Sequence, residues 1–389
     1  MLRQNRGRSM REVVIIDAVR TAIGKKKGAL SSVHPVDLLV PVLQALVDRN
    51  GLDAGLVEDV VVGCVTMTGE QGGNIARQAA LAAGFPVSVP AFSLNRMCGS
   101  SQQAIHNAAQ AILAGDMDIA IAAGVESMTR VPMGSDMGRF SRQLTNRYHI
   151  VPQGISAEMI AKKWGLSRKE LDEFSLASHE KAAAATDRGM FEREILPIEA
   201  PGENGPVVFA CDEGIRRDTS KEKLAALAPS FQPKGGVITA GNSSQVSDGA
   251  AGVLLMSAEK AKNLGLRPRA RIVARTVVGE DPILMLTGVI PATRRVLEKA
   301  GLRLDQVDVI EINEAFASVV KAWERELEPD MAKVNPRGGA IALGHPLGAS
   351  GARLMTTLLH ELEDMDGKYG LQVMCIGFGM ATATIIERL

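Results

Sequence analysis

The hydrophobic pattern along the chain alternates between short apolar runs and longer amphipathic stretches. Residues 13–17 (VVIID) and 59–63 (DVVVG) have the length and β-branched content of buried strands. Between them, apolar residues from 41 to 51 recur at helical spacing. Strands that alternate with helices of this length predict an α/β fold, with mixed sheets and helices packed on them.

The same order of elements occurs twice in the chain. Residues 271–275 (RIVAR), 291–301 (PATRRVLEKAG) and 308–312 (DVIEI) follow one another like residues 13–17, 41–51 and 59–63. Pro41 and Pro291 are 250 positions apart (291 − 41), and Gly51 and Gly301 have the same separation. Each copy predicts a strand, a helix closed by a glycine just past its C-terminus, and another strand.

A second pair of segments extends this internal repeat, which we call the echo. Helical spacing follows Cys98 over residues 104–113 and follows His345 over residues 354–362, and each stretch leads into an apolar run. We therefore predict two pseudo-symmetric halves, although two unrelated α/β units in one chain are the alternative interpretation.

The middle of the chain interrupts this rhythm. It holds a polar helical pattern (167–188), a Pro- and Gly-rich stretch (197–206) and a charged segment (212–223). We predict an N-terminal half from residues 1–126 and 247–268, an inserted loop domain from residues 127–246, and a C-terminal half from residues 269–389.

Composition and charge narrow the class of protein. The chain has 389 residues, of which 46% are hydrophobic, and its 44 Lys and Arg balance its 44 Asp and Glu. This balance argues against nucleic acid or an anionic membrane as a partner, and no apolar run approaches the length of a membrane span. The four cysteines are too few and too scattered for a disulfide scaffold or a zinc site, so we expect a reducing cytoplasm and no metal.

The first eleven residues are polar and Arg-rich, without the apolar stretch that secretion requires. A disordered extension before a start-like Met10 is a simpler interpretation than a transit peptide.

Cys98 is the first candidate for chemistry. It lies between an extended stretch (89–94) and a helical pattern, where free N–H groups and the helix dipole favour an anion. An ordinary thiol is only about 3% ionised at pH 7, so this location favours a nucleophile. A small buried core cysteine is the alternative interpretation.

His345 is the only one of the six histidines that is surrounded by glycines, in the run GGAIALGHPLGASGAR (338–353). A phosphate-binding loop is the alternative, but the spacing fits neither the dinucleotide fingerprint nor a P-loop. Two further candidates follow strands of the second half. Cys375 ends an apolar run in CIGFGM, and Asn313 opens the segment NEAFA. The alternative interpretation of Cys375 is a structural cysteine, and that of Asn313 is a helix cap.

These four segments, in this order and spacing, resemble the thiolase family from about residue 11 to residue 389. Further similar stretches are EQGGNIAR (70–77), GVESM (124–128) and AGNSS (240–244). The resemblance implies two similar α/β halves stacked as five layers (α-β-α-β-α), with a loop domain inserted in the first half. That expectation agrees with the echo.

The resemblance also implies roles for individual residues. Cys98 would attack the 3-oxo carbon of a 3-oxoacyl-CoA and carry the acyl group, while His345 takes its proton. Cys375 would protonate the carbanion that becomes acetyl-CoA. His345 with a water held by Asn313 would stabilise one oxyanion, and the N–H groups of Cys98 and Gly377 the other.

Substrate contacts follow from the same resemblance. Ser244 is similar in position to a contact of the pantetheine arm of CoA, and Arg216 or Arg217 would meet the nucleotide end. Met285 and Phe316 are expected to line the substrate site. CoA is a substrate in this scheme and no metal or redox cofactor is implied; the family also implies a homodimer or homotetramer.

The chain departs from the family pattern at two positions beside the site. Phe378 stands in the middle of a run that commonly reads Cys-x-Gly-Gly-Gly, and Gln153 stands where short-chain biosynthetic members often have Met. With the stretches CGSSQQ (98–103) and QGISAE (153–158), these features favour a degradative 3-oxoacyl-CoA thiolase. The alternative is an acetoacetyl-CoA thiolase that condenses two acetyl-CoA molecules, and a non-catalytic acyl-CoA-binding relative is a third class.

Overall fold

The computed structural model describes residues 11–202 and 205–389. The expected extension before Met10 lies outside these residues. Eleven strands of the described chain form one mixed sheet in the order β11-β12-β13-β10-β1-β9-β5-β3-β4, with β2 paired to β9 and β6 to β1. The strands are β1 (Val13–Thr21), β2 (Gly24–Lys25), β3 (Asp59–Gly63), β4 (Ala91–Leu94), β5 (Ile119–Ser127), β6 (Ile195–Leu196), β9 (Ser247–Ser257), β10 (Ala270–Gly279), β11 (Val309–Ile312), β12 (Tyr369–Ile376) and β13 (Met380–Arg388).

The two halves of this sheet have the same topology, which confirms the echo in the sequence. β1-β9-β5-β3 and β10-β13-β12-β11 both pair antiparallel, antiparallel and then parallel. Even the irregularities correspond, because β1 shifts register between Ile15 and Asp17 and β10 between Ile272 and Ala274. The halves join where β1 pairs antiparallel with β10.

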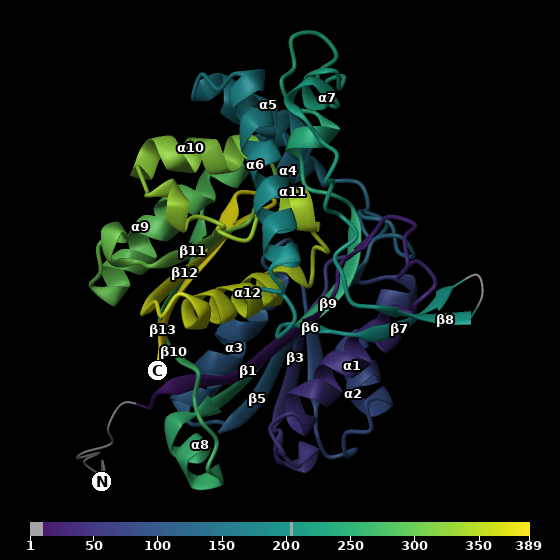
Figure 1. Cartoon of the computed structure of the whole chain (residues 1–389), viewed down its shortest axis with the longest axis vertical. Helices are drawn as coiled ribbons and strands as arrows, with labels where there is room; N and C mark the ends of the chain where they lie inside the picture. Colours follow the sequence, from purple (N-terminus) through teal and green to yellow (C-terminus); the bar gives the residue numbers. More distant parts are fainter. Residues whose placement is uncertain (1–10, 203–204) are drawn as a thin grey trace.

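The helices complete a five-layer arrangement (Figure 1). Three hydrophobic clusters fill the spaces between the layers. α1 and α2 cover one outer face, α3 and α12 lie in the middle, and α9 and α10 cover the other outer face. The α-helices are α1 (Pro35–Asp48), α2 (Ile75–Ala82), α3 (Ser100–Ala114), α4 (Arg142–Arg147), α5 (Gln153–Lys163), α6 (Arg168–Asp187), α7 (Lys221–Ala225), α8 (Ala258–Leu264), α9 (Val289–Ala300), α10 (Ala317–Leu327), α11 (Ala340–Leu343) and α12 (Ser350–Asp364).

The segment between β5 and β9 carries α4 to α7 and a separate hairpin of β7 (Ile198–Gly202) and β8 (Gly205–Phe209). The predicted limits of the inserted loop domain fall at the end of β5 and the beginning of β9. In Figure 1, α5, α6 and α7 lie beyond the end of the sheet at which α11 and the start of α12 are found. The insertion therefore covers the loops that hold the candidate residues of the second half.

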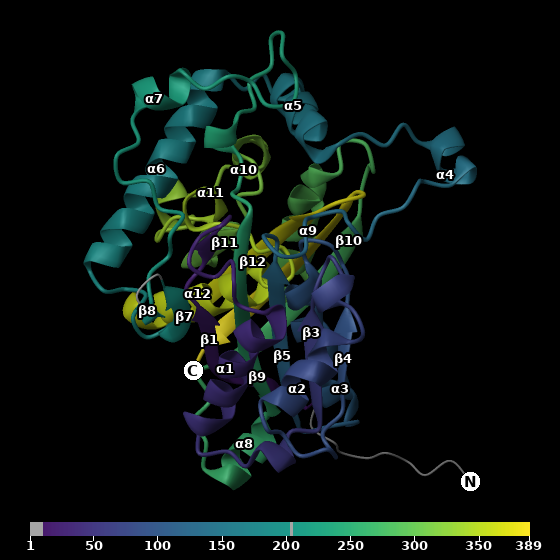
Figure 2. The same ribbon diagram turned by 90° about the vertical axis from the view of Figure 1, so that its right-hand side faces the viewer.

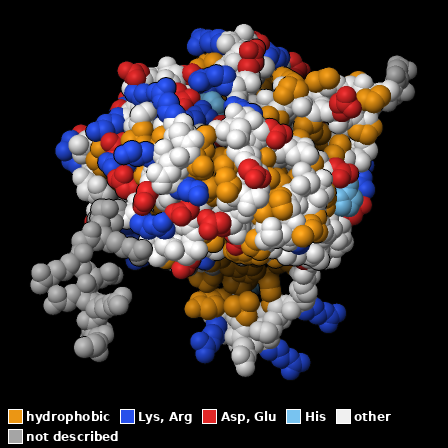
Figure 3. Space-filling view, turned by 90° about the horizontal axis from the view of Figure 1, so that it is seen from below, with side chains coloured by type: hydrophobic (Ala, Val, Ile, Leu, Met, Phe, Trp, Pro, Cys, Tyr) orange, Lys and Arg blue, Asp and Glu red, His pale blue; other side chains and the backbone are white. Residues whose placement is uncertain are grey.

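The chain around α4 projects from the body of the molecule (Figure 2). Apolar side chains lie along the projection and basic side chains at its tip, as the view from below shows (Figure 3). Met133 and Met137 are 58% and 50% exposed, and Phe140 and Tyr148 are exposed as well. Such a surface favours contact with another protein surface rather than with water.

The described helices are all too short or too polar to serve as membrane spans.

Candidate active site

Cys98 lies in a tight turn between β4 and α3. The residue before it, Met97, has a φ of 46°, in the left-handed region that non-glycine residues seldom adopt. Asn95 Oδ1 accepts the N–H of Met97 at 2.7 Å, and Ser100 Oγ accepts the N–H of Arg96 at 2.9 Å. These bonds hold the strained turn and place Cys98 two residues before the first residue of α3.

The Cys98 thiol is 4% exposed. Burial raises its pKa to about 11, although the N–H groups of Cys98 and Gly377 and the side-chain amide of Gln153 act as donors to the sulfur and lower it. The sequence predicted a location that favours the thiolate. In the free protein, the loss of hydration outweighs the nearby donors, so the thiol is neutral at pH 7.

Cys375 lies beside Cys98, near the end of β12. Burial raises the pKa of its thiol, and the neighbouring Cys98 raises it further. The Asn313 side chain and the N–H of Ala315 act on the Cys375 sulfur as donors and lower this pKa. The structure therefore brings three of the four predicted catalytic residues into one group.

His345 joins the group through Asn313. Its Nε2 lies 3.3 Å from Asn313 Nδ2, and its Nδ1 lies 2.6 Å from Ser350 Oγ. Ser350 donates its single hydroxyl proton to the carbonyl of Pro346 at 2.8 Å, so its oxygen accepts the proton of Nδ1. The nitrogen without a proton is then Nε2, which accepts from the Asn313 amide.

The His345 imidazole is neutral as well. Burial, with a smaller contribution from Arg353, lowers its pKa to about 3. No hydrogen bond in the described part of the chain joins His345 to Cys98 directly; the contacts run through Asn313 and Cys375. Asn313 Oδ1 is buried, and among the described residues it has no hydrogen-bond partner.

Close packing of α3 on α12 brings the two turns together. A Cβ on Gly351 would overlap the backbone nitrogen of Gln102, so only glycine permits this approach. Ser101 Oγ accepts the N–H of Ala352 at 2.8 Å across the same contact. The N-termini of the two helices, with Cys98 before one and His345 before the other, are held side by side.

Glu126 is a positioning residue that the sequence did not single out. Its buried carboxylate accepts the N–H groups of Val65 and Thr66 at 2.9 and 3.1 Å and that of Gly348 at 2.9 Å. Burial raises its pKa. It thereby connects the loop after β3 to the loop that carries His345. The available signal was a carboxylate near the end of an otherwise apolar strand, β5.

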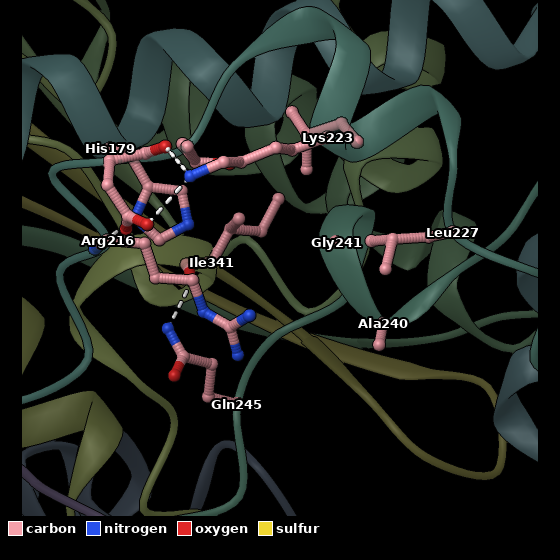
Figure 4. A pocket seen from close by; sticks show the side chains of 11 residues that line it. His179, Arg216, Lys223, Leu227, Ala240, Gly241, Gln245 and Ile341 are labelled. Carbon is pink, nitrogen blue, oxygen red and sulfur yellow. Dashed lines mark hydrogen bonds and ion pairs between the residues drawn. The ribbon is translucent and has the colours of Figure 1, made fainter.

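Arg216 borders a cavity of about 140 Å³ beside the site (Figure 4). Its lining is partly apolar, from Leu224, Leu227 and Ile341. The charged part of the lining comes from Arg216 and from Lys223, which pairs with the lining residue Asp218 at 2.8 Å. Figure 4 shows the Arg216 side chain reaching toward the space that Gln245 and Ile341 border. Arg217, the other predicted candidate, pairs with Asp187 at 2.8 Å instead.

The cavity adjoins the catalytic group through Gln245. The Gln245 side chain donates to the carbonyl of Ile341 at 2.8 Å. The backbone carbonyl of Gln245 accepts the N–H of His345 at 3.2 Å. The neighbouring Ser244 is half-buried, and its N–H bonds the carbonyl of Ala315 at 2.9 Å. A molecule in the cavity would therefore lie next to the loops that carry His345 and Asn313.

Met285 and Phe316 lie in the hydrophobic cluster that also contains Cys375. Both are buried, and the Phe316 ring packs edge-on against Phe231 with centroids 6.0 Å apart. Neither borders the cavity of Arg216. Their predicted contact with substrate thus concerns the acyl side of the site and stays a prediction.

Phe378 takes an unusual backbone conformation beside Gly377. Its φ is 61°, in the left-handed region, which costs a non-glycine residue about 1–2 kcal/mol. Its ring packs edge-on against Phe140 of the α4 projection, with centroids 5.8 Å apart. The departure from the glycine run therefore connects the active-site turn to the inserted segment.

A doubled α/β fold that groups two buried cysteines, an asparagine and a histidine is typical of a class of acyltransferases. Comparison with known proteins gives the family. The model for the thiolase N-terminal domain matches residues 13–259, and the model for the thiolase C-terminal domain matches residues 266–388. The chain belongs to the thiolase family.

Relatives cover almost the whole chain. It is 51% identical to the steroid 3-ketoacyl-CoA thiolase FadA6 of Mycobacterium tuberculosis, covering 99% of this chain and 96% of the relative. It is 47% identical to an acetyl-CoA acetyltransferase of Pseudomonas aeruginosa, covering 97% and 100%. The crystal structure of the Bacillus anthracis acetyl-CoA acetyltransferase superposes with a TM-score of 0.92 at 41% identity, covering 98% of this chain and 100% of that one. These matches confirm the predicted fold and the predicted class of acyltransferase.

Proposed function

We propose that this protein cleaves 3-oxoacyl-CoA with CoA, giving acetyl-CoA and an acyl-CoA two carbons shorter, through an acyl group on Cys98. The observation that carries the proposal is the series of contacts from Cys98 through Cys375 and Asn313 to His345. A nucleophile, a proton donor for carbon and a base meet in one buried place, which is what cleavage between C2 and C3 requires.

In the first half of the reaction, the Cys98 sulfur attacks the 3-oxo carbon and His345 Nε2 takes the thiol proton. The C2–C3 bond breaks, leaving a thioester on Cys98 and the enolate of acetyl-CoA. Cys375 donates its proton to C2 and becomes a thiolate. The raised pKa of Cys375 suits this role, because its proton stays in place until a carbanion arrives.

In the second half, the thiol of an incoming CoA gives its proton to Cys375 and attacks the thioester. Cys98 leaves as a thiolate and recovers its proton from His345. The cycle therefore returns each group to its first state, and no step in it calls for a metal or a redox group. CoA is a substrate in this scheme.

The oxygen atoms that gain negative charge need fixed donors. The N–H groups of Cys98 and Gly377 face the nucleophile and would bind the oxyanion formed at C3. His345 would stabilise the enolate oxygen together with a water on Asn313, whose unpartnered Oδ1 supports this role. Arg216 would hold the nucleotide end of CoA, because its cavity combines basic and apolar lining residues. Ser244, next to the lining residue Gln245 in the chain, would contact the pantetheine arm.

A substrate series tests the proposal and its alternative. The full chain should show thiolysis of 3-oxoacyl-CoA, followed by loss of the 3-oxoacyl thioester, and incubation without CoA should leave the acyl mass on the Cys98 peptide. Cys98→Ala should abolish both. Equal or better rates on acetoacetyl-CoA than on longer or ring-bearing substrates would favour the acetyl-CoA-condensing alternative, and unchanged thiolysis by Cys98→Ala would refute the mechanism.

We also propose a cytoplasmic homodimer or homotetramer. A reducing compartment suits a nucleophile that works as a free thiol beside a second one. The apolar projection around α4, with its exposed Met133 and Met137, supports a contact between copies. Light scattering on the full chain should give two or four copies, and Met133→Lys with Met137→Lys should lower that number.

A further inference from the structure

Glu314 is a buried acidic residue that follows Asn313 in the chain and has no part in the steps described above. Its side chain accepts three hydrogen bonds from three different segments of the described chain. Ser178 of α6 donates to the carboxylate at 2.7 Å, Asn335 at 2.9 Å, and the N–H of Ile341 in α11 at 3.2 Å. The carboxylate therefore connects the inserted segment and α11 to the turn that carries Asn313.

The three donors are fixed in direction, so they select the kind of group that can stand between them. The Asn335 amide donates to the carbonyl of Ile312 and accepts the N–H of the same residue, both at 2.9 Å, so the amide cannot turn over. The Ser178 hydroxyl accepts the N–H of Gly339 at 3.1 Å and gives its own proton to Glu314. The third donor is a backbone N–H. An ionised carboxylate, which only accepts, satisfies all three donors, whereas an amide would place an N–H against one of them.

Close packing places Glu314 between the segments that carry Asn313 and His345. A Cβ on Gly339 would lie 2.3 Å from the carboxyl carbon of Glu314, so the chain just before α11 rests directly on this side chain. α11 then ends two residues before His345. On the other side, the N–H of Asn313 is held by the carbonyl of Val373 at 3.0 Å. The carboxylate is therefore a spacer that sets how far the Asn313 turn lies from the loop of His345.

We propose that Glu314 is a positioning residue, which holds Asn313 at the distance from His345 that stabilisation of the enolate oxygen requires. In the structure, Asn313 Nδ2 lies 3.3 Å from His345 Nε2. The proposal rests on the proposed function, in which His345 and a water on Asn313 serve that oxygen. The enolate forms only when C2–C3 breaks, and the oxyanion at C3 is assigned to other donors, the N–H groups of Cys98 and Gly377. Loss of the Glu314 carboxylate should therefore slow formation of the acyl-enzyme and spare the transfer of the acyl group to CoA.

Transient kinetics on the full chain separates these two steps. Rapid mixing with 3-oxoacyl-CoA in the absence of CoA gives the rate at which the acyl mass appears on the Cys98 peptide, and later addition of CoA gives the rate at which that mass is lost. Glu314→Gln keeps the size of the side chain and replaces one acceptor oxygen with a donor. Asp17→Asn is the matched control, because it makes the same change at a buried carboxylate of β1, which accepts a hydrogen bond from Arg269 at 2.8 Å. Glu298→Gln makes the change at an exposed position.

We expect Glu314→Gln to slow formation of the acyl-enzyme about tenfold to a hundredfold, the cost of a small misplacement of a catalytic group, and to change acyl transfer to CoA by less than about threefold. Both controls should keep the ratio of the two rates that the parent shows. Ser178→Ala removes one of the three donors, should slow the same step by a smaller factor, and serves if the Gln variant does not fold. Equal losses in both steps, or an unchanged first step, would overturn the proposal. Absence of thiolysis in the parent would instead refute the proposed function.

Discussion

In the free protein, Cys98 and His345, the proposed nucleophile and base, are both uncharged at pH 7. The pKa of the Cys98 thiol is about 11 and that of the His345 imidazole is about 3, and burial is the main cause of both shifts. A full proton transfer before substrate binds is therefore strongly unfavourable. In the proposed mechanism, the proton would therefore leave as the bond between sulfur and carbon forms, when the negative charge moves to an oxygen facing the N–H groups of Cys98 and Gly377.

This timing makes the tautomer of His345 important, and Ser350 fixes it. Because Ser350 Oγ donates to Pro346 and accepts from Nδ1, Nε2 stays unprotonated and can receive the thiol proton. Ser350→Ala removes the acceptor, and we expect kcat/KM to fall roughly tenfold to a hundredfold with little change in KM. Ser350→Thr retains the hydroxyl and should keep most of the activity. Steady-state kinetics on both variants checks this, and an equal loss in both would show that packing, not the hydrogen bond, is responsible.

Cys375 and Cys98 have different partners and should fail in different steps. Cys375→Ser replaces a thiol with a hydroxyl, which is a far weaker acid, so protonation of the carbanion slows. We expect cleavage of C2–C3 to fall by a factor of roughly a hundred or more, and acyl transfer from Cys98 to CoA to fall less. Burst measurements of acyl-enzyme formation separate the steps, with Cys211→Ser as the exposed-cysteine control. Equal losses in both steps would contradict this division of labour.

At the scale of elements, the crossing of α3 and α12 sets the distance between the two catalytic turns. A methyl group at Gly351 would meet the backbone of Gln102, which cannot give way as a side chain can. Gly351→Ala should cost about 1–3 kcal/mol of unfolding free energy and should lower kcat more than that loss explains, because Cys98 and His345 move apart. Gly279→Ala, which meets no atom within 4 Å, is the control and should be nearly neutral. Denaturant unfolding and thiolysis, measured on folded protein, check both effects. A Gly351→Ala protein that keeps its kcat would mean that the crossing does not set the geometry.

The sequence predicted elements best where local chemistry ends them. The helical pattern at 167–188 is α6, whose capping box joins Ser167 and Glu170. The pattern that begins at Pro41 belongs to α1, which begins earlier, at Pro35, with His34 as its N-cap. Either proline could have opened the helix, since proline suits a first turn, and only burial of both turns against the sheet decides between them. The hairpin of β7 and β8 lies in the Pro- and Gly-rich stretch. No alternation of apolar and polar residues there predicted it.

The candidate site shows the same limit. Cys98, His345, Cys375 and Asn313 were predicted because motif and echo mark the turns in which they stand, and the structure groups all four. The contacts of Ser350, Glu126 and Gln153 depend on how separate segments pack, which no spacing along the chain records. Gln153 and Phe378 were noticed only as departures from the family pattern. Only the structure shows that Gln153 lies near Cys98 and that Phe378 packs against Phe140.

At the scale of the whole molecule, the two halves share a layer of buried polar contacts in addition to the apolar core around α3 and α12. Gln102 of α3 donates to Thr384 Oγ1 of β13 at 2.7 Å and accepts from Thr382 at 2.7 Å. His106, one turn further along α3, bonds the same Thr384 hydroxyl at 2.8 Å. Buried polar groups are costly unless they are paired, so these contacts favour one alignment of the halves over others.

His106 also makes this junction sensitive to acid. Burial, with smaller contributions from Arg275 and Arg96, lowers its pKa from 6.5 to about 3. Well above pH 6.5 the ring is neutral in both the folded and the unfolded chain, and it contributes no pH dependence. Below that value His106 binds a proton in the unfolded chain, whereas in the folded chain it binds one only near pH 3. The free energy of unfolding therefore falls as the pH falls.

We expect this group alone to remove about 2 kcal/mol of unfolding free energy between pH 7 and pH 5. His106→Gln can still bond Thr384 but cannot take up a proton, so its unfolding free energy should fall less steeply over this range. His149→Gln, at an exposed position, should keep the slope of the parent. Denaturant unfolding of the three proteins at several pH values measures the slopes, and the comparison does not depend on any constant loss caused by the substitution. Parallel slopes for His106→Gln and the parent would place the acid sensitivity elsewhere in the molecule.

The enzyme activity should follow the same loss of fold. Because His345 stays neutral down to about pH 3, acid inactivation above pH 5 should result from unfolding rather than from protonation of that base.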